Sequence, residues 1–165
     1  MERSGNLRPL SNSQNHDCFG CSSNNASGLQ MKFFTDGEAL FSWLTVPNRF
    51  CGWENQVHGG ILATILDETM GWSAIHFLKK FAMTNTMTVE FLEPVHTGEE
   101  IRVEGRVLKV VGKRLATVEG HLYKSANKLC AKCVGTFRLF TAAAMVRLGR
   151  KKGDPIKKFD FLIEP

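Results

Sequence analysis

The stretch that decides the fold reads Val57-His58-Gly59-Gly60-Ile61-Leu62-Ala63-Thr64-Ile65-Leu66-Asp67-Glu68. Two glycines begin a long apolar run with helical character, and an acidic pair interrupts it two turns later. Glycine at a helix start lets another group approach the backbone closely. The first N–H groups of a helix lack intrahelical partners and lie at the positive end of its dipole. They are suitable donors to a carbonyl oxygen that gains negative charge, so the stretch indicates acyl-transfer chemistry.

The length and composition indicate one soluble globular domain. The chain has 165 residues, of which 43% are hydrophobic and 22% are charged. These values are ordinary for a domain that forms its own hydrophobic core. No uninterrupted apolar run is long enough to span a bilayer, and the first residues lack the apolar stretch of a signal peptide. We therefore expect a cytoplasmic location and no membrane partner.

Part of the net charge of +5 is concentrated near the C-terminus, where six lysines and arginines in the last 19 residues face three acids. One interpretation is a solvated basic tail. The alternative is attraction of a polyanionic ligand, such as a nucleotide-bearing cofactor. Because no basic motif with interleaved aromatic residues occurs elsewhere, we expect no nucleic-acid partner.

The five cysteines are an odd number, which argues against a disulfide framework. Cys18 and Cys21, and again Cys130 and Cys133, have the spacing of zinc ligands. More than a hundred residues separate the two pairs, and the second pair lies in a predicted strand, where positions three apart point to opposite faces. We interpret these thiols as small buried hydrophobic groups and expect no metal and no cofactor, with a structural zinc as the alternative.

A single helix is predicted from about residue 59 to 79, about 30 Å long. It is apolar nearly all round, as is typical of a buried helix. One face carries small residues with an acid at its centre, namely Gly60, Ala63, Asp67, Gly71 and Ala74. A charge on such a face is either a structural carboxylate satisfied by N–H groups or a functional one. Glu68 turns onto another face, and we interpret it as a structural or rim residue.

Runs that favour β-structure lie on both sides of the helix. Before it, residues 29–34 and 39–46 predict a hairpin that turns at Asp36-Gly37. After it, four longer runs are joined by short turns, which imply an antiparallel meander. These runs are residues 83–95, 100–111, 114–125 and 129–141. The predicted fold class is α+β, with one antiparallel sheet curled around one long central helix that must be covered on most sides.

This architecture, with His58-Gly59-Gly60 and an acid nine residues after the histidine, resembles the hotdog-fold thioesterases of the PaaI-like group. The resemblance runs from about residue 18 to 140. It includes Cys18-Phe19-Gly20-Cys21 followed by Asn25-Ala26-Ser27-Gly28-Leu29, a pattern of one thioesterase branch, and the strand within residues 84–95. The fold prediction rests mainly on this ordered set.

The resemblance implies hydrolysis of acyl-coenzyme A thioesters at a site shared between subunits of a homodimer or homotetramer. Gly59 or Gly60 would present a backbone N–H to the thioester carbonyl, and Asp67 would be the general base or the nucleophile. His58 would orient the loop and contact the substrate. Thr84 matches a position where relatives often carry a hydroxyl near the attacking water, although Thr86 and Thr88 share its strand face.

The loop before the helix is expected to contribute to substrate binding. Phe50 and Trp53 could cover an acyl pocket, although such aromatic residues are more often part of a core. Many relatives carry Asn or Gln six residues before the histidine, where this chain has Gly52. Asn55 and Gln56 could take its place from a shifted loop. The missing amide favours the alternative function, a non-catalytic acyl-CoA binding or sensing module on the same fold.

The chain is thus divided into a flexible lead-in at residues 1–17, a hotdog thioesterase domain at residues 18–140 and a basic C-terminal tail at residues 141–165. The tail, together with Lys109, Lys113 and Arg114, could contact the phosphates of the coenzyme, if it is not simply a solvated basic segment.

Overall fold

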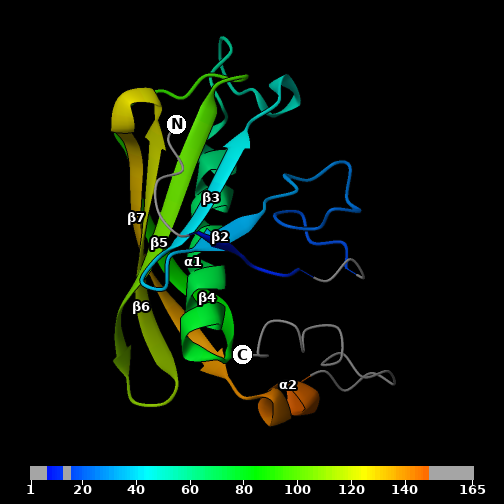
Figure 1. Cartoon of the computed structure of the whole chain (residues 1–165), viewed down its shortest axis with the longest axis vertical. Coiled ribbons are helices and arrows are strands. Elements are labelled where there is room, and N and C mark those ends of the chain that lie inside the picture. Colours follow the sequence, from blue (N-terminus) through cyan, green and yellow to red (C-terminus); the bar gives the residue numbers. More distant parts are fainter. Residues whose placement is uncertain (1–6, 13–15, 149–165) are drawn as a thin grey trace.

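The computed structural model describes residues 7–12 and 16–148, and it shows a seven-stranded antiparallel sheet around a long helix (Figure 1). The sheet has the strand order β1-β2-β3-β5-β6-β7-β4. The helices are α1 (Gly59–Leu78) and α2 (Ala142–Leu148), with single 3-10 turns at Asn48–Phe50 and Ser125–Asn127. The strands are β1 (Arg8–Pro9), β2 (Phe33–Thr35), β3 (Leu40–Thr45), β4 (Phe81–Phe91), β5 (Glu100–Val111), β6 (Leu115–Lys124) and β7 (Lys128–Phe140).

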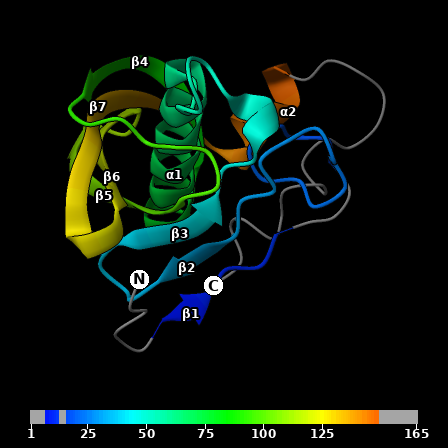
Figure 2. The ribbon, with the colours of Figure 1, turned by 90° about the horizontal axis from the view of Figure 1, so that it is seen from above.

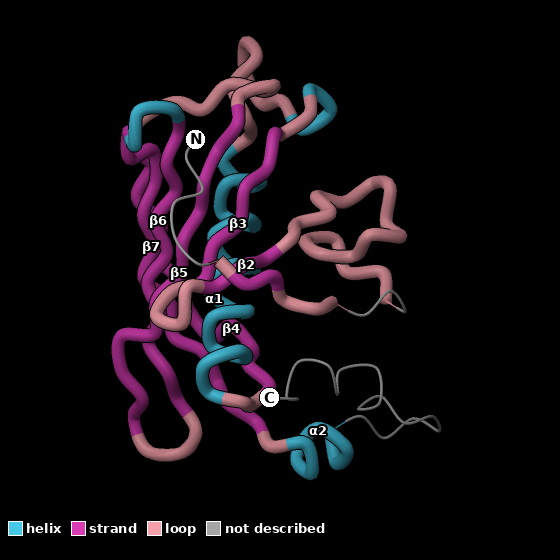
Figure 3. Tube along the Cα trace, in the orientation of Figure 1, coloured by secondary structure: helices cyan, strands magenta, loops and turns pink. Residues whose placement is uncertain are grey.

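Helix α1 lies inside the curve of the sheet, as the view from above shows (Figure 2). Its apolar side chains form the core with the inward side chains of the strands, and Ile65, Leu66 and Met70 are fully buried. Figure 3 shows the same arrangement, with the long helix α1 beside the strands of the sheet. The predicted architecture, one antiparallel sheet wrapped around one central helix, is therefore confirmed.

The predicted hairpin forms, but its first strand is shorter than expected and gains a neighbour. Strand β2 begins at Phe33 rather than at residue 29, because the backbone N–H groups of Leu29 and Met31 donate to Phe19 and Gly20 in the preceding loop. Strand β1, within the segment predicted as a lead-in, pairs antiparallel with β2. The N-terminal segment is thereby attached to the edge of the sheet, although no hydrophobic pattern in the sequence indicated a strand there.

Glycines in the sheet allow α1 to approach closely. Gly105 of β5 and Gly120 of β6 are direct partners in the strand pairing. A Cβ atom on Gly105 would collide with Ser73 Oγ and lie 3.1 Å from the Thr69 carbonyl oxygen. A Cβ atom on Gly120 would lie 3.1 Å from Leu66. The helix therefore occupies space that side chains would otherwise fill.

The helix face that meets these glycines carries two fully buried hydroxyl groups. Thr69 Oγ1 donates to the Ile65 carbonyl at 2.8 Å, and Ser73 Oγ donates to the Thr69 carbonyl at 2.8 Å. A buried hydroxyl without a partner would be costly, but these bonds within the helix satisfy both groups. Small polar residues can thus lie against the sheet with no polar partner from it.

Strand β4 lies at one edge of the sheet. Within the described residues it pairs with β7 alone, so its outer backbone edge has no neighbouring strand. Met83 and Phe91 on this strand are more than half exposed. An exposed edge with apolar side chains is a surface on which another strand can add. Separately, neither of the two described helices is long and apolar enough to cross a membrane.

Replacing Gly105 with alanine is expected to destabilise the protein by about 1–3 kcal/mol, because the added methyl group overlaps Ser73 and Thr69 of the helix. The matched control is Gly71→Ala on α1, where an added Cβ would lie 3.8 Å from Phe137, an ordinary contact. This control is expected to stabilise the protein by up to about 1 kcal/mol, since alanine favours helix over glycine. Urea denaturation measures both changes, and equal effects would contradict the close packing.

Candidate active site

Asp67 of α1 and Thr84 of β4 meet at the edge of the molecule. Thr84 Oγ1 donates a hydrogen bond of 2.6 Å to Asp67 Oδ1. Both residues line a cavity of about 350 Å³ between α1, the start of β4 and the N-terminal segment. The structure thus brings together two residues that lie 17 positions apart and were both predicted as site residues. The second carboxylate oxygen of Asp67 remains for another ligand.

The same contacts distinguish Thr84 from the other threonines on its strand. Thr86 Oγ1 lies 2.7 Å from Thr136 Oγ1 of β7, so its hydroxyl is engaged across the sheet. The pairing of β4 with β7 shifts register between Thr84 and Thr86. This irregularity places the two hydroxyls in different surroundings, and only the Thr84 hydroxyl is bonded to Asp67.

His58 has a defined structural role at the start of α1. It is the N-cap residue, and its Nδ1 accepts a hydrogen bond of 2.9 Å from the Gly60 N–H. The Gly60 N–H is therefore already engaged. Within the described part of the chain, the Gly59 N–H donates no hydrogen bond, as is typical of the first residue of a helix. Gly59, rather than Gly60, is the available backbone donor.

The Gly59 N–H and the Asp67 carboxylate of one chain are far apart. Asp67 is the eighth residue after Gly59 in α1, which corresponds to a rise of about 12 Å along the axis. A single carbonyl group needs its hydrogen-bond donor and its attacking water each within about 3 Å. One chain therefore cannot supply both groups to the same thioester.

The loop residues predicted to bind substrate lie outside the cavity beside Asp67. Phe50 is half-buried and packs edge-on against Phe19, whereas the Trp53 side chain is 77% exposed. Asn55 and Gln56 are exposed, and backbone hydrogen bonds fix both residues. The Asn55 carbonyl accepts from the Thr97 N–H. The Gln56 N–H donates to the Trp53 carbonyl, and the Gln56 carbonyl accepts from the Gly52 N–H.

At Gly52 there is little room for the amide side chain that many relatives carry. A Cβ atom there would lie 3.1 Å from His58 Cα and 3.4 Å from His58 Cβ. The backbone of Gly52 instead donates to the Gln56 carbonyl at 2.7 Å. The tight loop thus replaces the usual amide with direct packing of backbone against His58.

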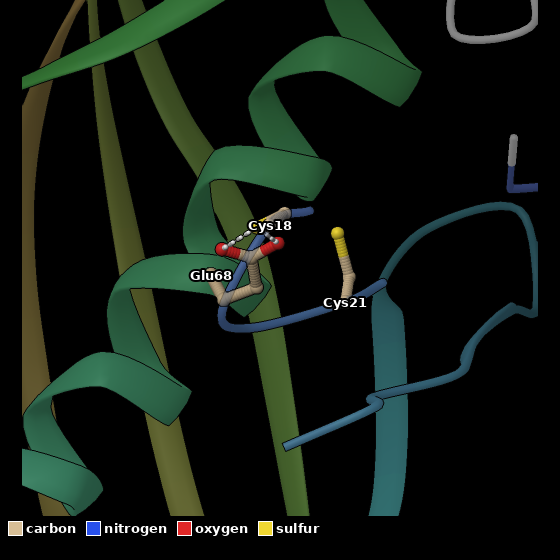
Figure 4. Close-up of side chains that lie close together, drawn as sticks. All are labelled: Cys18, Cys21 and Glu68. Atoms are coloured by element: carbon tan, nitrogen blue, oxygen red, sulfur yellow. Dashed lines mark hydrogen bonds between the residues drawn. The ribbon is translucent and has the colours of Figure 1, made fainter. Parts of the chain in front are cut away.

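A second group of polar side chains, Cys18, Cys21 and Glu68, borders the same cavity (Figure 4). The Cys18 Sγ lies 3.5 and 3.8 Å from the two carboxylate oxygens of Glu68. Trp72 Nε1 donates to Glu68 Oε1 at 3.2 Å. We interpreted Glu68 as a structural or rim residue, but its carboxylate points at the cysteine loop. The position of Glu68 next to Asp67 in the sequence gives no indication that the cysteine loop lies beside it.

Burial and hydrogen bonding change the acidity of this group. A hydrogen bond from Cys21 is the main cause that lowers the pKa of Cys18, to about 5. The same interaction, together with burial, raises the pKa of Cys21. Burial raises the pKa of Glu68 to about 7. The pKa values of the three side chains therefore depend on one another.

The other cysteine pair does not join this group. Cys130 and Cys133 are buried on β7 and behave as small hydrophobic residues in the core. Burial, together with the nearby charge of Asp67, raises the pKa of Cys133 to about 11. Among the described residues, Cys18, Cys21 and Glu68 form the one group of three potential metal ligands. A zinc site made from all four cysteines is not formed.

Comparison with known families gives one match, to the thioesterase superfamily, over residues 54–131. This range includes α1, β4, β5 and β6, and with them Asp67 and Thr84. A Saccharolobus solfataricus protein described as a candidate esterase is 34% identical over 86 residues, which cover 51% of this chain and 55% of that protein. The Xenopus laevis acyl-coenzyme A thioesterase THEM4 is 33% identical over 60 residues, or 36% of this chain and 27% of its own.

Solved structures share the fold. The PaaI protein of the E. coli phenylacetic acid degradation operon has a TM-score of 0.61 and 19% identity, and the match covers 68% of this chain and 80% of PaaI. The Streptococcus mutans protein smu.793, solved with acetyl CoA bound, has a TM-score of 0.59 and 15% identity, over 86% of this chain and 94% of that one. At these identities the comparison shows a common fold.

Replacing His58 with alanine is expected to cost about 1 kcal/mol of folding stability, because the Gly60 N–H loses its capping acceptor. His58→Asp is expected to recover that loss, since aspartate is a good N-cap residue. Chemical denaturation of the two variants measures the difference. An alanine variant as stable as the wild type would show that the capping bond contributes nothing.

Proposed function

We propose that this hotdog-fold member of the thioesterase superfamily hydrolyses acyl-coenzyme A thioesters to a free acid and coenzyme A. The observation that carries the proposal is the Asp67–Thr84 pair at the mouth of a cavity. The chain spans about half the length of the first curated relatives it matches, so activity and substrate are inferred from its own residues.

Asp67 is proposed as the general base. Thr84 holds one of its carboxylate oxygens, which fixes the orientation of the other toward the cavity. That second oxygen would take a proton from water as the water oxygen attacks the thioester carbonyl. Collapse of the tetrahedral intermediate then breaks the C–S bond, and the proton passes to the departing coenzyme A thiolate. Proton transfer of this kind contributes about 10²–10⁴-fold to a rate.

The Gly59 N–H is proposed to stabilise the negative charge on the carbonyl oxygen. It is the unengaged donor at the positive end of α1. Since one chain cannot bring this donor and Asp67 to the same carbonyl, the donor must come from a second subunit. The exposed edge of β4, which carries Thr84, is the surface where that subunit would add. We therefore propose a homodimer with two shared sites.

A basic cavity next to this strand is proposed to hold the phosphates of the coenzyme. Its lining includes Asn85, the neighbour of Thr84, and among the described residues every charged side chain of the lining is cationic. These are Lys80, Lys113, Arg114, Arg138 and Arg147. Lys113 and Arg114 are sequence candidates for this contact that line the cavity, whereas Lys109 is not part of the lining. Residues 149–165 of the basic tail lie outside the described residues.

Replacing Asp67 with asparagine is expected to lower kcat by about 10²–10⁴-fold, because the amide keeps the size of the carboxylate but accepts no proton. Thr84→Ser should retain most of the activity, and Thr84→Val should lose part of it, since valine cannot orient Asp67. Glu38→Gln changes an exposed carboxylate in the turn between β2 and β3, away from the cavity and from β4; it is the matched control and should act as the wild type. Release of free thiol from short, long and aromatic acyl-CoAs measures the rates.

A folded Asp67→Asn variant with the wild-type kcat would contradict the assignment of the base. Binding of acyl-CoA by the wild type without turnover of any substrate would instead support the sensing module. The tight packing at Gly52, which excludes the usual amide, would then be the structural reason.

Mixing two inactive variants tests whether the site is shared. Gly59→Pro removes the proposed donor, yet proline is well accepted at the first position of a helix. In a mixed dimer of Gly59→Pro and Asp67→Asn, one of the two sites would be intact. Random mixing of the refolded chains should therefore recover about a quarter of the wild-type activity, as expected for a two-fold symmetric dimer. No recovery above either variant alone would show that each site belongs to one chain.

A further inference from the structure

The loop at Cys18–Cys21 and the helix residue Glu68 form a compact group with the dimensions of a metal site (Figure 4). The ligand atoms of the three side chains all lie within 4.8 Å of one another. In a tetrahedral zinc site, Zn–S distances of about 2.3 Å and Zn–O distances of about 2.1 Å place sulfur and oxygen about 3.6 Å apart. The distances from Cys18 Sγ to the Glu68 oxygens, 3.5 and 3.8 Å, match that edge.

The loop is shaped around the carboxylate. A Cβ atom on Gly20 would lie 2.5 Å from Glu68 Cδ, so only glycine at this position lets the carboxylate reach the two thiols. The backbone is fixed by hydrogen bonds from the Met31 N–H to the Gly20 carbonyl and from the Leu29 N–H to the Phe19 carbonyl. The ligand positions are thus held before any ion binds.

Neighbouring side chains orient the group without competing for it. Trp72 Nε1 donates to Glu68 Oε1, which is the kind of outer contact that fixes a ligating carboxylate. His16 Nδ1 accepts from the Cys18 N–H, and its Nε2 lies 2.9 Å from Asn12 Oδ1. Both ring nitrogens of His16 are therefore engaged, and three potential ligands remain among the described residues.

We propose that Cys18, Cys21 and Glu68 bind one zinc ion, with a fourth coordination position open to the cavity. Two thiolates and a carboxylate suit zinc among the common biological cations. Three protein ligands with an open position leave room for water or for a substrate atom. The ion would connect the N-terminal loop to α1 on the wall of the cavity that Asp67 also lines.

Metal content is the direct test. The full untagged chain is purified without chelator and under a phosphine reductant, and its zinc is counted by mass spectrometry. The expected result is close to one zinc per chain. After removal with dipicolinate, zinc is titrated back against a competing dye. Glu68→Gln and Cys18→Ser are expected to weaken binding at least tenfold, whereas Cys51→Ser, a half-buried thiol outside the group, should bind as the wild type.

Cobalt substitution of the wild type provides a reading that does not depend on how well the variants fold. Co²⁺ held by two thiolates gives intense charge-transfer absorption in the near ultraviolet. The absence of this absorption would overturn the proposal. Equal zinc affinity in the wild type, Glu68→Gln and Cys18→Ser would also overturn it, provided that both variants have the circular dichroism spectrum of the folded protein. A reduced protein that binds no zinc but forms a Cys18–Cys21 disulfide on oxidation would also overturn it. Each reading is independent of thioester turnover, so its failure leaves the proposed hydrolysis untouched.

Discussion

The close approach of α1 to the sheet is the constraint on which the rest of the structure depends. Gly105, Gly120 and Gly135 lie on β5, β6 and β7, and at each of them a Cβ atom would press against the helix or a side chain packed beside it. Without side chains at these points the sheet can curve around the helix, and the apolar helix can be covered on most of its sides. The helix keeps one side near the exposed edge of β4, and that is where Asp67 meets Thr84.

Two adjacent residues of this helix, Asp67 and Glu68, contact different parts of the protein. Consecutive residues of an α-helix are rotated by about 100° about its axis. Asp67 therefore reaches β4 while Glu68 reaches the cysteine loop, and both line one cavity. Burial raises the pKa of Glu68 to about 7, which favours its protonated form. The two carboxylates are thus suited to separate tasks in one cavity: orientation of water, and fixation of the N-terminal loop.

Local patterns in the sequence were sufficient for the helix and for the strands from β2 onward, whereas the roles of Asp67 and Thr84 in one site were implied by the resemblance to hotdog-fold thioesterases. The helix is apolar nearly all round, and the strands after it are joined by short turns, so their order leaves few arrangements open. The position of the N-terminal loop was different, because it depends on contacts between residues far apart, such as Cys18 with Glu68 and β1 with β2. The contact of Glu68 with the cysteine loop was therefore not predicted. The short helix α2, in the region predicted as a tail, likewise has no amphipathic pattern long enough to detect.

The proposed hydrolysis depends most on two groups from different chains that act on one thioester carbonyl. A crystal structure with an acyl-CoA analogue whose thioester is replaced by a non-hydrolysable ketone tests this directly. If the site is shared, the ketone oxygen accepts a hydrogen bond from the Gly59 N–H of one subunit. Asp67 of the other subunit then binds a water molecule that lies next to the carbonyl carbon. An analogue whose carbonyl lies away from Gly59, or is surrounded by a single chain, would contradict it.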